Sequence, residues 1–211
     1  MAETPEIETR RFASQEKWLV WLERNHAKSP GLWVKFAKKN SGVASVTYAE
    51  AVEAALCYGW IDGQLRSVDA TYYVQRFTPR RPRSKWSKIN CGKADELIAA
   101  GRMRPAGLRQ IEAAKRDGRW AAAYDSARTI TVPEDLRRAL AKDAAARKFF
   151  ATLDAANRYA VLFRVHDAKR PEARQRRIAT MVAMLAAAKT IHPVKSGFKS
   201  RKRSVARRKR G

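Results

Sequence analysis

The residue types that bind anions crowd together between residues 76 and 90, in the segment RFTPRRPRSKWSKIN. Six of its residues are basic, and Phe77 and Trp86 stand among them. Guanidinium groups bind phosphate or carboxylate through paired hydrogen bonds, and an aromatic ring can stack on a base or a sugar. We therefore predict an anion-binding site in this basic segment, formed by Arg76, Arg80, Arg81, Lys85, Trp86 and Asn90.

The alternative for the basic segment is structural: Trp86 would belong to the core, and the charges would form a solvated face with a few ion pairs. Pro79 and Pro82 favour the binding interpretation, because each proline fixes the path of the chain and limits how far the charges can spread. A helix expected to begin after Ser84 or Ser87 adds free N–H donors for an anion.

Asp62, between Ile61 and Gly63, is the candidate for a catalytic group. A partly buried carboxylate needs a cation or several N–H donors, and Arg76 or Arg81 would be the cation. A general base also needs a second titratable partner, which no spacing in the sequence supplies. We favour a structural role for Asp62 and assign no catalytic residue.

No cofactor and no metal site are predicted. Cys57 and Cys91 form no CxxC pair, the three histidines are isolated, and the glycines spell no nucleotide-binding fingerprint. Cys57 ends an apolar stretch and is predicted to be a buried thiol. Trp60, between a helix end and a strand start, is predicted to pack in the core.

Hydrophobic periodicity supplies the elements that would hold these residues in the N-terminal half. It predicts a helix over 15–27, a strand over 32–36 and a helix from Thr47, which has the capping-box spacing with Glu50, to Gly59. A hairpin over 61–78 follows. A turn at Asp69 and Ala70 would pair Asp62 with Phe77, Gln64 with Gln75 and Arg66 with Tyr73.

The C-terminal half reads as helices. The expected ranges are 93–100, 105–117, 133–141, 143–153, 155–169 and 171–189. The predicted class is α+β, with a small antiparallel sheet packed with helices in the N-terminal half and a helical C-terminal half. We expect a flexible lead-in over 1–13, a globular region over 14–189 with a possible subdivision near 101–130, and a disordered basic tail over 190–211.

The charge of the chain indicates an anionic partner. Lys and Arg number 45 against 20 Asp and Glu, a net charge of +25, and nucleic acid is the commonest partner of such proteins. The segment from Lys195 to Gly211 holds nine basic residues and no acidic one. Nonspecific contacts to phosphates are predicted for Lys199, Arg201, Lys202, Arg203, Arg207, Arg208, Lys209 and Arg210. The alternative is a solubilising extension.

The sequence shows no export or membrane signal. The start, MAETPEIETRRF, is acidic where a signal peptide is basic, and no run of about 18 apolar residues occurs. We expect a cytoplasmic protein, associated with the nucleoid if the tail binds nucleic acid. The sequence leaves the oligomeric state open.

Four motifs resemble those of the bacterial YdeI/OmpD-associated family, also called bacteriocin-protection proteins. They are ALCYGWIDG at 55–63, RFTPRRPRSKWSKIN at 76–90, GRMRPAGL at 101–108 and DGRW at 117–120. The resemblance runs from about Trp18 to Lys189, and the basic tail departs from it. It implies a protective phenotype and a porin association, and brings no catalytic residues. A protein of this charge would repel cationic peptides, so any protection would be indirect.

Two functions are therefore in competition. The first is a binding protein for an anionic ligand, with nonspecific nucleic-acid affinity from the tail. The second is an enzyme that acts on a small phosphorylated or carboxylated substrate, with Asp62 as base. Convergence of Asp62, Arg76, Arg81 and Trp86 on one closed pocket would favour the enzyme, and their spread over an open basic surface would favour the binding protein.

Overall fold

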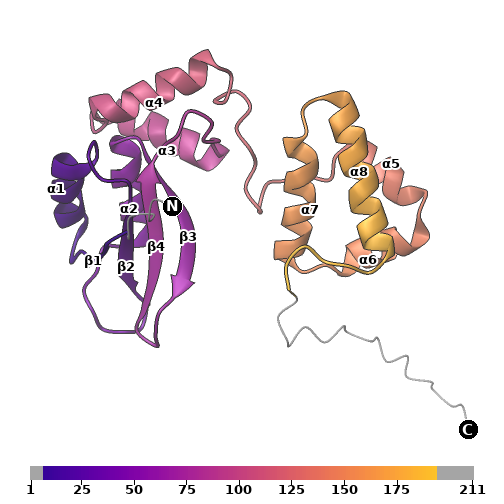
Figure 1. Ribbon diagram of the computed structural model, residues 1–211, viewed down its shortest axis with the longest axis horizontal. Coiled ribbons are helices and arrows are strands. Elements are labelled where there is room, and N and C mark those ends of the chain that lie inside the picture. The colour runs from indigo at the N-terminus through magenta and orange to yellow at the C-terminus, as the bar shows by residue number, and fades with distance from the viewer. Residues whose placement is uncertain (1–6, 194–211) are drawn as a thin grey trace, which may run out of the picture. The chain divides into compact units, whose positions relative to one another are not determined.

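The structure, a computed structural model, describes residues 7–193. The chain forms two compact units, residues 1–123 and 124–211, and each has its own hydrophobic core (Figure 1). The boundary falls within the interval 101–130 in which a subdivision was expected. The tail residues predicted to contact nucleic acid, from Lys199 to Arg210, lie outside the described residues.

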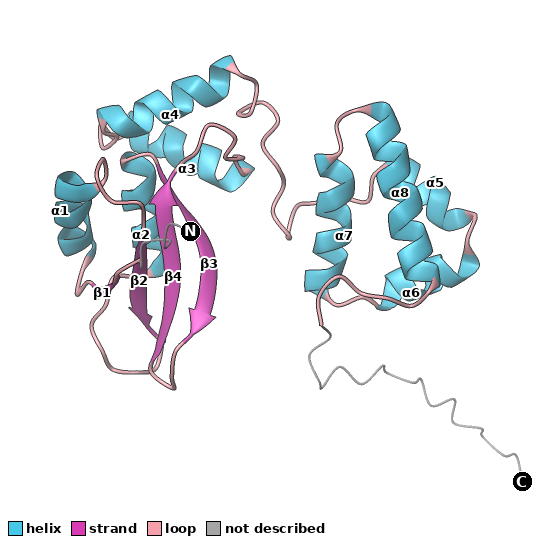
Figure 2. Ribbon diagram, in the orientation of Figure 1, coloured by secondary structure: helices cyan, strands magenta, loops and turns pink. Residues whose placement is uncertain are grey.

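The first unit contains all the strands of the described chain together with half of its helices (Figure 2). Its elements are β1 (Thr9–Arg11), α1 (Gln15–Asn25), β2 (Leu32–Ala37), α2 (Tyr48–Cys57), β3 (Trp60–Ser67), β4 (Tyr72–Pro79), α3 (Lys88–Ala99) and α4 (Pro105–Arg116). The second unit contains α5 (Glu134–Ala141), α6 (Ala144–Thr152), α7 (Ala155–Asp167) and α8 (Pro171–Ala186). The α+β class is confirmed, and Ser87 rather than Ser84 caps α3.

The sheet is mixed, where an antiparallel one was predicted. Its strand order is β1-β2-β4-β3, and β1 runs parallel to β2 while the other neighbours are antiparallel. The added strand lies in the predicted flexible lead-in, and the next residue, Phe12, is buried. A strand of three residues is too short to show periodicity, and this one exists because β2 offers it a pairing edge.

The hairpin of β3 and β4 contains a β-bulge that the sequence did not show. Asp62 pairs with Phe77 as predicted, but beyond the bulge Leu65 pairs with Gln75, and Ser67 rather than Arg66 pairs with Tyr73. The bulge inserts an extra residue at Gly63 and Gln64. The glycine adopts the irregular backbone conformation at little cost in energy.

Aromatic side chains from α1 and the sheet contribute to the core of the first unit. Trp18 and Trp21 of α1 stack with ring centroids 5.2 Å apart, and both meet the edge of Trp60, whose indole N–H donates to the carbonyl oxygen of His26. Trp60 is fully buried, so its predicted place in the core is confirmed.

Two glycines let the start of α4 approach the end of α2. A Cβ on Gly107 would lie 2.4 Å from the carbonyl oxygen of Cys57, and one on Gly59 would lie 2.9 Å from the carbonyl oxygen of Ala106. Gly59 also has a φ of +71°, which other residues adopt at a cost. Its carbonyl oxygen accepts a 3.0 Å hydrogen bond from the Arg80 backbone N–H, which anchors the end of β4.

The second unit is a helical cluster fastened by two polar contacts. Arg174 of α8 donates to both carboxylate oxygens of Asp135 at the start of α5, and the guanidinium holds the pKa of Asp135 below its usual value. Asn157 of α7 is buried, and its Oδ1 accepts from the backbone N–H groups of Ile191 and His192 at 3.0 and 2.8 Å.

Changing Trp60 to Ala should destabilise the first unit by roughly 3 to 5 kcal/mol, because the change removes a fully buried indole and leaves a cavity. All six tryptophans lie between residues 18 and 120, so urea unfolding followed by tryptophan fluorescence reports this unit alone. Val20→Ala, at an exposed site, should change stability by less than about 0.5 kcal/mol. An unfolding midpoint for Trp60→Ala equal to that of the parent would contradict the core assignment.

Candidate functional site

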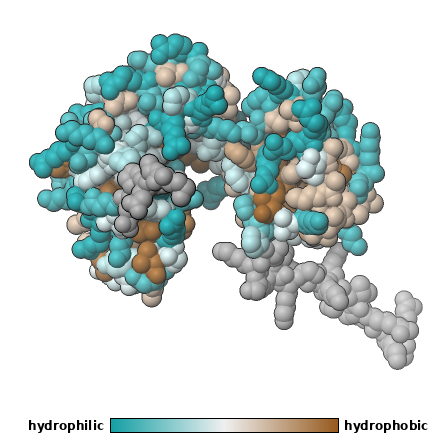
Figure 3. All heavy atoms as spheres, viewed as in Figure 1, coloured by the Kyte–Doolittle hydropathy of each residue, from teal (hydrophilic) through white to brown (hydrophobic). Residues whose placement is uncertain are grey.

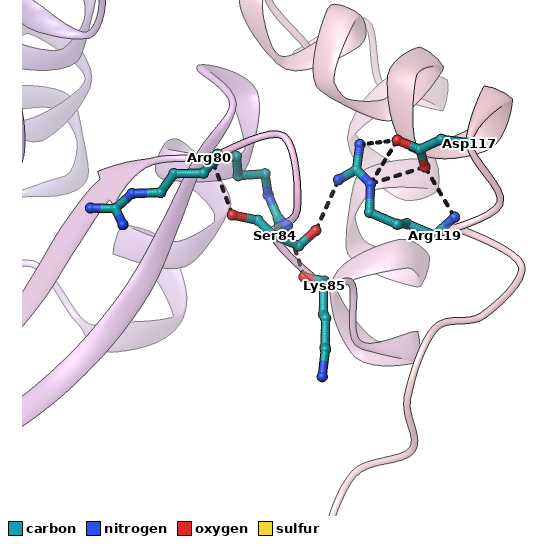
Figure 4. Close-up of polar contacts among 6 residues, drawn as sticks. Arg80, Ser84, Lys85, Asp117 and Arg119 are labelled. Carbon is teal, nitrogen blue, oxygen red and sulfur yellow. Dashed lines mark hydrogen bonds and ion pairs between the residues drawn. The ribbon is translucent and has the colours of Figure 1, made fainter. Parts of the chain in front are cut away.

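The loop that joins β4 to α3, residues 80–87, is built around a buried arginine. Arg80 is only 5% exposed, and its guanidinium carbon lies 3.5 Å from the centre of the Trp86 ring. Its Nη1 donates to the carbonyl oxygen of Lys85 at 3.1 Å (Figure 4). We call residues 80–87 the basic loop. The Arg80 side chain spans the inside of this loop and so fixes its shape.

Trp86 also packs, in a tilted arrangement, on an aromatic residue that follows α4. Trp86 packs on Trp120 with ring centroids 4.9 Å apart, and the Lys115 ammonium group lies 5.2 Å from the centre of the Trp120 ring. Trp86 is 1% exposed, so it belongs to the core and offers no ring face to a ligand. A place for Trp86 in the core was the structural alternative that the sequence left open.

A second arginine fastens the loop from outside its own segment. Arg119, just after α4, donates from Nη1 to the carbonyl oxygen of Ser84 at 2.9 Å and pairs with Asp117 (Figure 4). Ser84 in turn accepts from the Arg81 backbone N–H through its Oγ at 2.9 Å. The Arg119 guanidinium holds the pKa of Asp117 below its usual value. Arg119 was not predicted to be a site residue, although the DGRW motif that contains it had been identified.

The remaining predicted residues divide by exposure. Arg81, Arg83 and Lys85 are exposed on the basic loop, Lys88 is exposed in the first turn of α3, and Asn90 is half-buried there. Hydrophilic residues cover much of the visible surface, and a broad area of more hydrophobic residues lies on the second unit (Figure 3). The loop thus presents cations on a backbone that is fixed from both sides. Anion binding at the predicted residues stays a prediction.

Asp62 is held by neutral partners. Its Oδ2 accepts from the Tyr48 hydroxyl at 2.8 Å and from the Gln75 amide at 3.1 Å, and the same amide nitrogen donates to the carbonyl oxygen of Gly63. The predicted partners Arg76 and Arg81 do not appear in these contacts. The cause is strand alternation, because Asp62 pairs with Phe77 on the core face and the preceding residue Arg76 points to the other face.

The four residues whose convergence would mark a catalytic pocket therefore lie apart. Asp62 faces α2, Arg76 lies on the opposite face of the sheet, Trp86 is buried and Arg81 is exposed on the basic loop. These four residues therefore form neither one closed pocket nor one open basic surface.

A pocket that the sequence did not predict lies where β2 runs into the loop before α2. Its volume is about 820 Å³, and its lining includes the aromatic side chains Phe36, Tyr48 and Tyr73 with Lys38 and Lys39 beside them. Burial raises the pKa of the Tyr73 hydroxyl. The Tyr48 hydroxyl links this pocket to Asp62. The sequence signal was the run KKNSG at 38–42, which reads as an ordinary polar turn.

The cysteines are unsuited to nucleophilic chemistry. Both Cys57 and Cys91 are free and buried, and burial raises the pKa of Cys57 and takes that of Cys91 to about 11. A thiol with such a pKa stays protonated at neutral pH. Residues 7–193 contain no group of His, Cys, Asp and Glu side chains placed to hold a metal ion. No helix in the same range is long and apolar enough to cross a membrane.

Changing Arg80 to Gln should lower the stability of the first unit by about 2 kcal/mol, the value of a desolvated cation–π contact. Arg81→Gln, one residue away and exposed, should leave it within about 0.5 kcal/mol of the parent. Urea unfolding with tryptophan fluorescence gives both values. Equal midpoints for the two variants would mean that Arg80 does not support the loop.

Two family models match separate parts of the chain. Residues 129–188 match the family described as "Bacteriocin-protection, YdeI or OmpD-Associated", which confirms the resemblance over this segment. Residues 10–110 match "Domain of unknown function (DUF8412)". No curated protein and no solved structure matches the chain. Three of the motifs that suggested the family lie within 10–110, and the fourth, DGRW, lies between the two segments.

Proposed function

We propose that this chain, whose residues 129–188 match the YdeI/OmpD-associated family, is a binding protein for an anionic ligand, and that the basic loop is its binding site. The observation that carries the proposal is the way the loop is held. The Arg80–Lys85 bond and the Arg119–Ser84 bond fix it at two points while Arg81 and Arg83 remain exposed.

A fixed loop favours binding because less conformational entropy is lost when the ligand arrives. Immobilising a long side chain or a mobile loop costs about 0.5 to 1.5 kcal/mol for each side chain ordered. Here the backbone that carries Arg81 and Arg83 is already held by hydrogen bonds. Guanidinium groups also suit phosphate groups because they donate two parallel hydrogen bonds.

Nucleic acid is the ligand class that the charge of the whole chain favours. A net charge of +25 attracts a polyanion over a distance set by the ionic strength, and nine of the basic residues that give this charge lie in the tail beyond residue 194. Protection against bacteriocins, which the family description names, would then be an indirect result of this binding. We place the protein in the cytoplasm, at the nucleoid.

A second candidate is a small anionic ligand in the pocket beside Tyr48. A volume of about 820 Å³ lies in the usual range for such ligands, about 300 to 1,000 Å³. The aromatic side chains would pack against a flat apolar group of the ligand, and Lys38 and Lys39 would pair with the negative charge of the ligand. An enzyme acting on a phosphorylated or carboxylated substrate would use this pocket, with Asp62 acting through the Tyr48 hydroxyl.

Changing Arg81 and Arg83 to Gln should abolish most of the stabilisation that an anion gives the first unit, while melting without ligand stays unchanged. A ligand at a hundredfold its dissociation constant stabilises by about 2.7 kcal/mol. The measurement is a thermal melt followed by tryptophan fluorescence, with polyphosphate and a short oligonucleotide as ligands.

The matched control changes Arg24 and Arg109 to Gln, which removes the same charge from exposed positions on α1 and α4. The control should keep nearly all of the ligand stabilisation. If both double variants lose the same amount, the effect belongs to net charge and the basic loop is not a site. If a nucleotide stabilises both variants as it does the parent, the pocket beside Tyr48 is favoured.

Replacing the nine basic residues between 195 and 211 with Gln should weaken binding to duplex DNA of every sequence alike. Each lost phosphate contact should reduce the slope of log affinity against log salt by about 0.9. Fluorescence anisotropy at several salt concentrations measures the slope. A slope equal to that of the parent would show that the tail makes no phosphate contacts.

A further inference from the structure

The two faces of the sheet differ in what they carry. The face toward α1 and α2 holds Leu32, Val34, Phe36, Trp60 and Phe77, all of which belong to the hydrophobic core. The other face, which we call the open face, has no member of this cluster, although Val74 on it is buried. Its larger side chains are Trp33, Lys35, Arg66, Tyr72 and Arg76, and these are half-buried or exposed.

Each aromatic ring of the open face is paired with a cation. The Arg66 guanidinium lies 4.5 Å from the centre of the Trp33 ring, and the Lys35 ammonium lies 4.2 Å from the centre of the Tyr72 ring. Trp33 is on β2 and Arg66 is on β3, with β4 between them, so the arginine side chain reaches across a whole strand. A planar guanidinium on an indole gives a layer on which a base can stack.

The pairing register places the backbone positions of Lys35 and Arg66 between those of Trp33 and Tyr72. Trp33 pairs with Arg76, Lys35 pairs with Val74, and Ala37 pairs with Tyr72. Val74 also pairs with Arg66 on its other side. The row that contains Lys35 and Arg66 therefore lies between the row of Trp33 and the row of Tyr72. Trp33 and Ala37, the partner of Tyr72, are four positions apart, or roughly 13 Å along the strand.

On β2, β3 and β4, the charged side chains of the open face are the cations Lys35, Arg66 and Arg76, and the Nε of Arg76 is buried with no hydrogen-bond partner among the described residues. An acidic residue near this part of the face is Asp69 at the hairpin turn, and its carboxylate accepts from the backbone N–H groups of Thr71 and Tyr72. The partner that complements the open face is therefore an anion carrying flat rings.

We propose that the open face binds single-stranded nucleic acid, with one base on the Trp33–Arg66 layer and another on the Tyr72 ring, from which the Lys35 ammonium group moves to an intervening phosphate. A duplex is the wrong shape for this surface. Its bases are paired and stacked about 3.4 Å apart, whereas stacking points roughly 13 Å apart need a strand whose bases are splayed.

This site goes beyond the basic loop. It uses β2, β3 and β4, and it predicts a requirement for bases, whereas the loop and the tail recognise phosphate. Stacking on an aromatic side chain is tolerant of sequence, because every base has a ring face. The open face therefore predicts a preference for single strands over duplex without a preference among sequences.

The test compares binding of a 12-residue oligothymidine, its duplex, and an abasic strand of the same length to the full chain by fluorescence anisotropy at high salt. Changing Trp33 and Tyr72 together to Leu should weaken the single strand by about tenfold for each base that loses its ring, with duplex and abasic binding unchanged. Changing both to Phe should restore binding, because the rings return.

Three outcomes would overturn the proposal. They are equal affinity of the parent for thymidine and abasic strands, an equal loss of duplex and single strand in the Leu variant, and no loss at all. The Arg81→Gln/Arg83→Gln variant should weaken all three ligands alike. This variant therefore tests the basic loop as a binding site separately from the open face.

A second measurement avoids variants and so does not depend on their folding. Oligonucleotides carrying 5-iodouracil can be photocrosslinked to the unmodified full chain, and the crosslinked peptides identified by mass spectrometry. Crosslinks at Trp33 or Tyr72 are expected. Crosslinks confined to the segment beyond residue 194 would overturn the open face as a site.

Discussion

Burial of the Arg80 guanidinium sets the arrangement of the surface that follows β4. A buried cation is costly unless it is compensated, and here the Trp86 ring and the Lys85 carbonyl oxygen compensate it. Both partners come from the loop that Arg80 itself begins, so the loop has to curl around the side chain. The backbone N–H of Arg80 meanwhile donates to the carbonyl oxygen of Gly59, whose lack of a Cβ permits the close approach of α4. The motifs around residues 57–60, 80–87 and 104–107 are therefore parts of one packing unit.

Much of the fold could be predicted because its signals are local. The capping box at Thr47, the glycines after helices and the alternation along β2 each follow from a few neighbouring residues. The pairing of Asp62 with Phe77 also agrees with the prediction, but only because the extra residue of the bulge offsets a one-residue difference in register near the turn, where Ser67 rather than Arg66 pairs with Tyr73. What local patterns miss is the bulge, which shifts the register beyond Asp62, and β1, which is ordered by its partner strand.

The candidate site was harder to predict, because charge in a sequence does not show exposure. Arg80 and Arg81 are neighbours of the same type, yet one is buried against an indole and the other is exposed. The alternation along β2 predicts that Trp33 and Lys35 lie on the less buried side of the strand, and the structure places them there. The layer on Trp33 is formed by Arg66, thirty-three residues later, and no spacing rule connects the two. The family resemblance shows the same limit, since its motifs lie in one unit and the matching family segment in the other.

The bulge in β3 has a consequence for how copies of this protein behave in a crowded cell. β3 is an edge strand of the sheet, and most of its residues are exposed, including Leu65 at 60%. A long flat edge invites a second copy to add its own strand, which is a route to fibrils. The extra residue at Gly63 and Gln64 interrupts the ladder and increases the twist, so a foreign strand cannot pair along the whole edge. The irregularity that shifts the register of the hairpin thus also shortens the stretch of edge on which a second copy could pair.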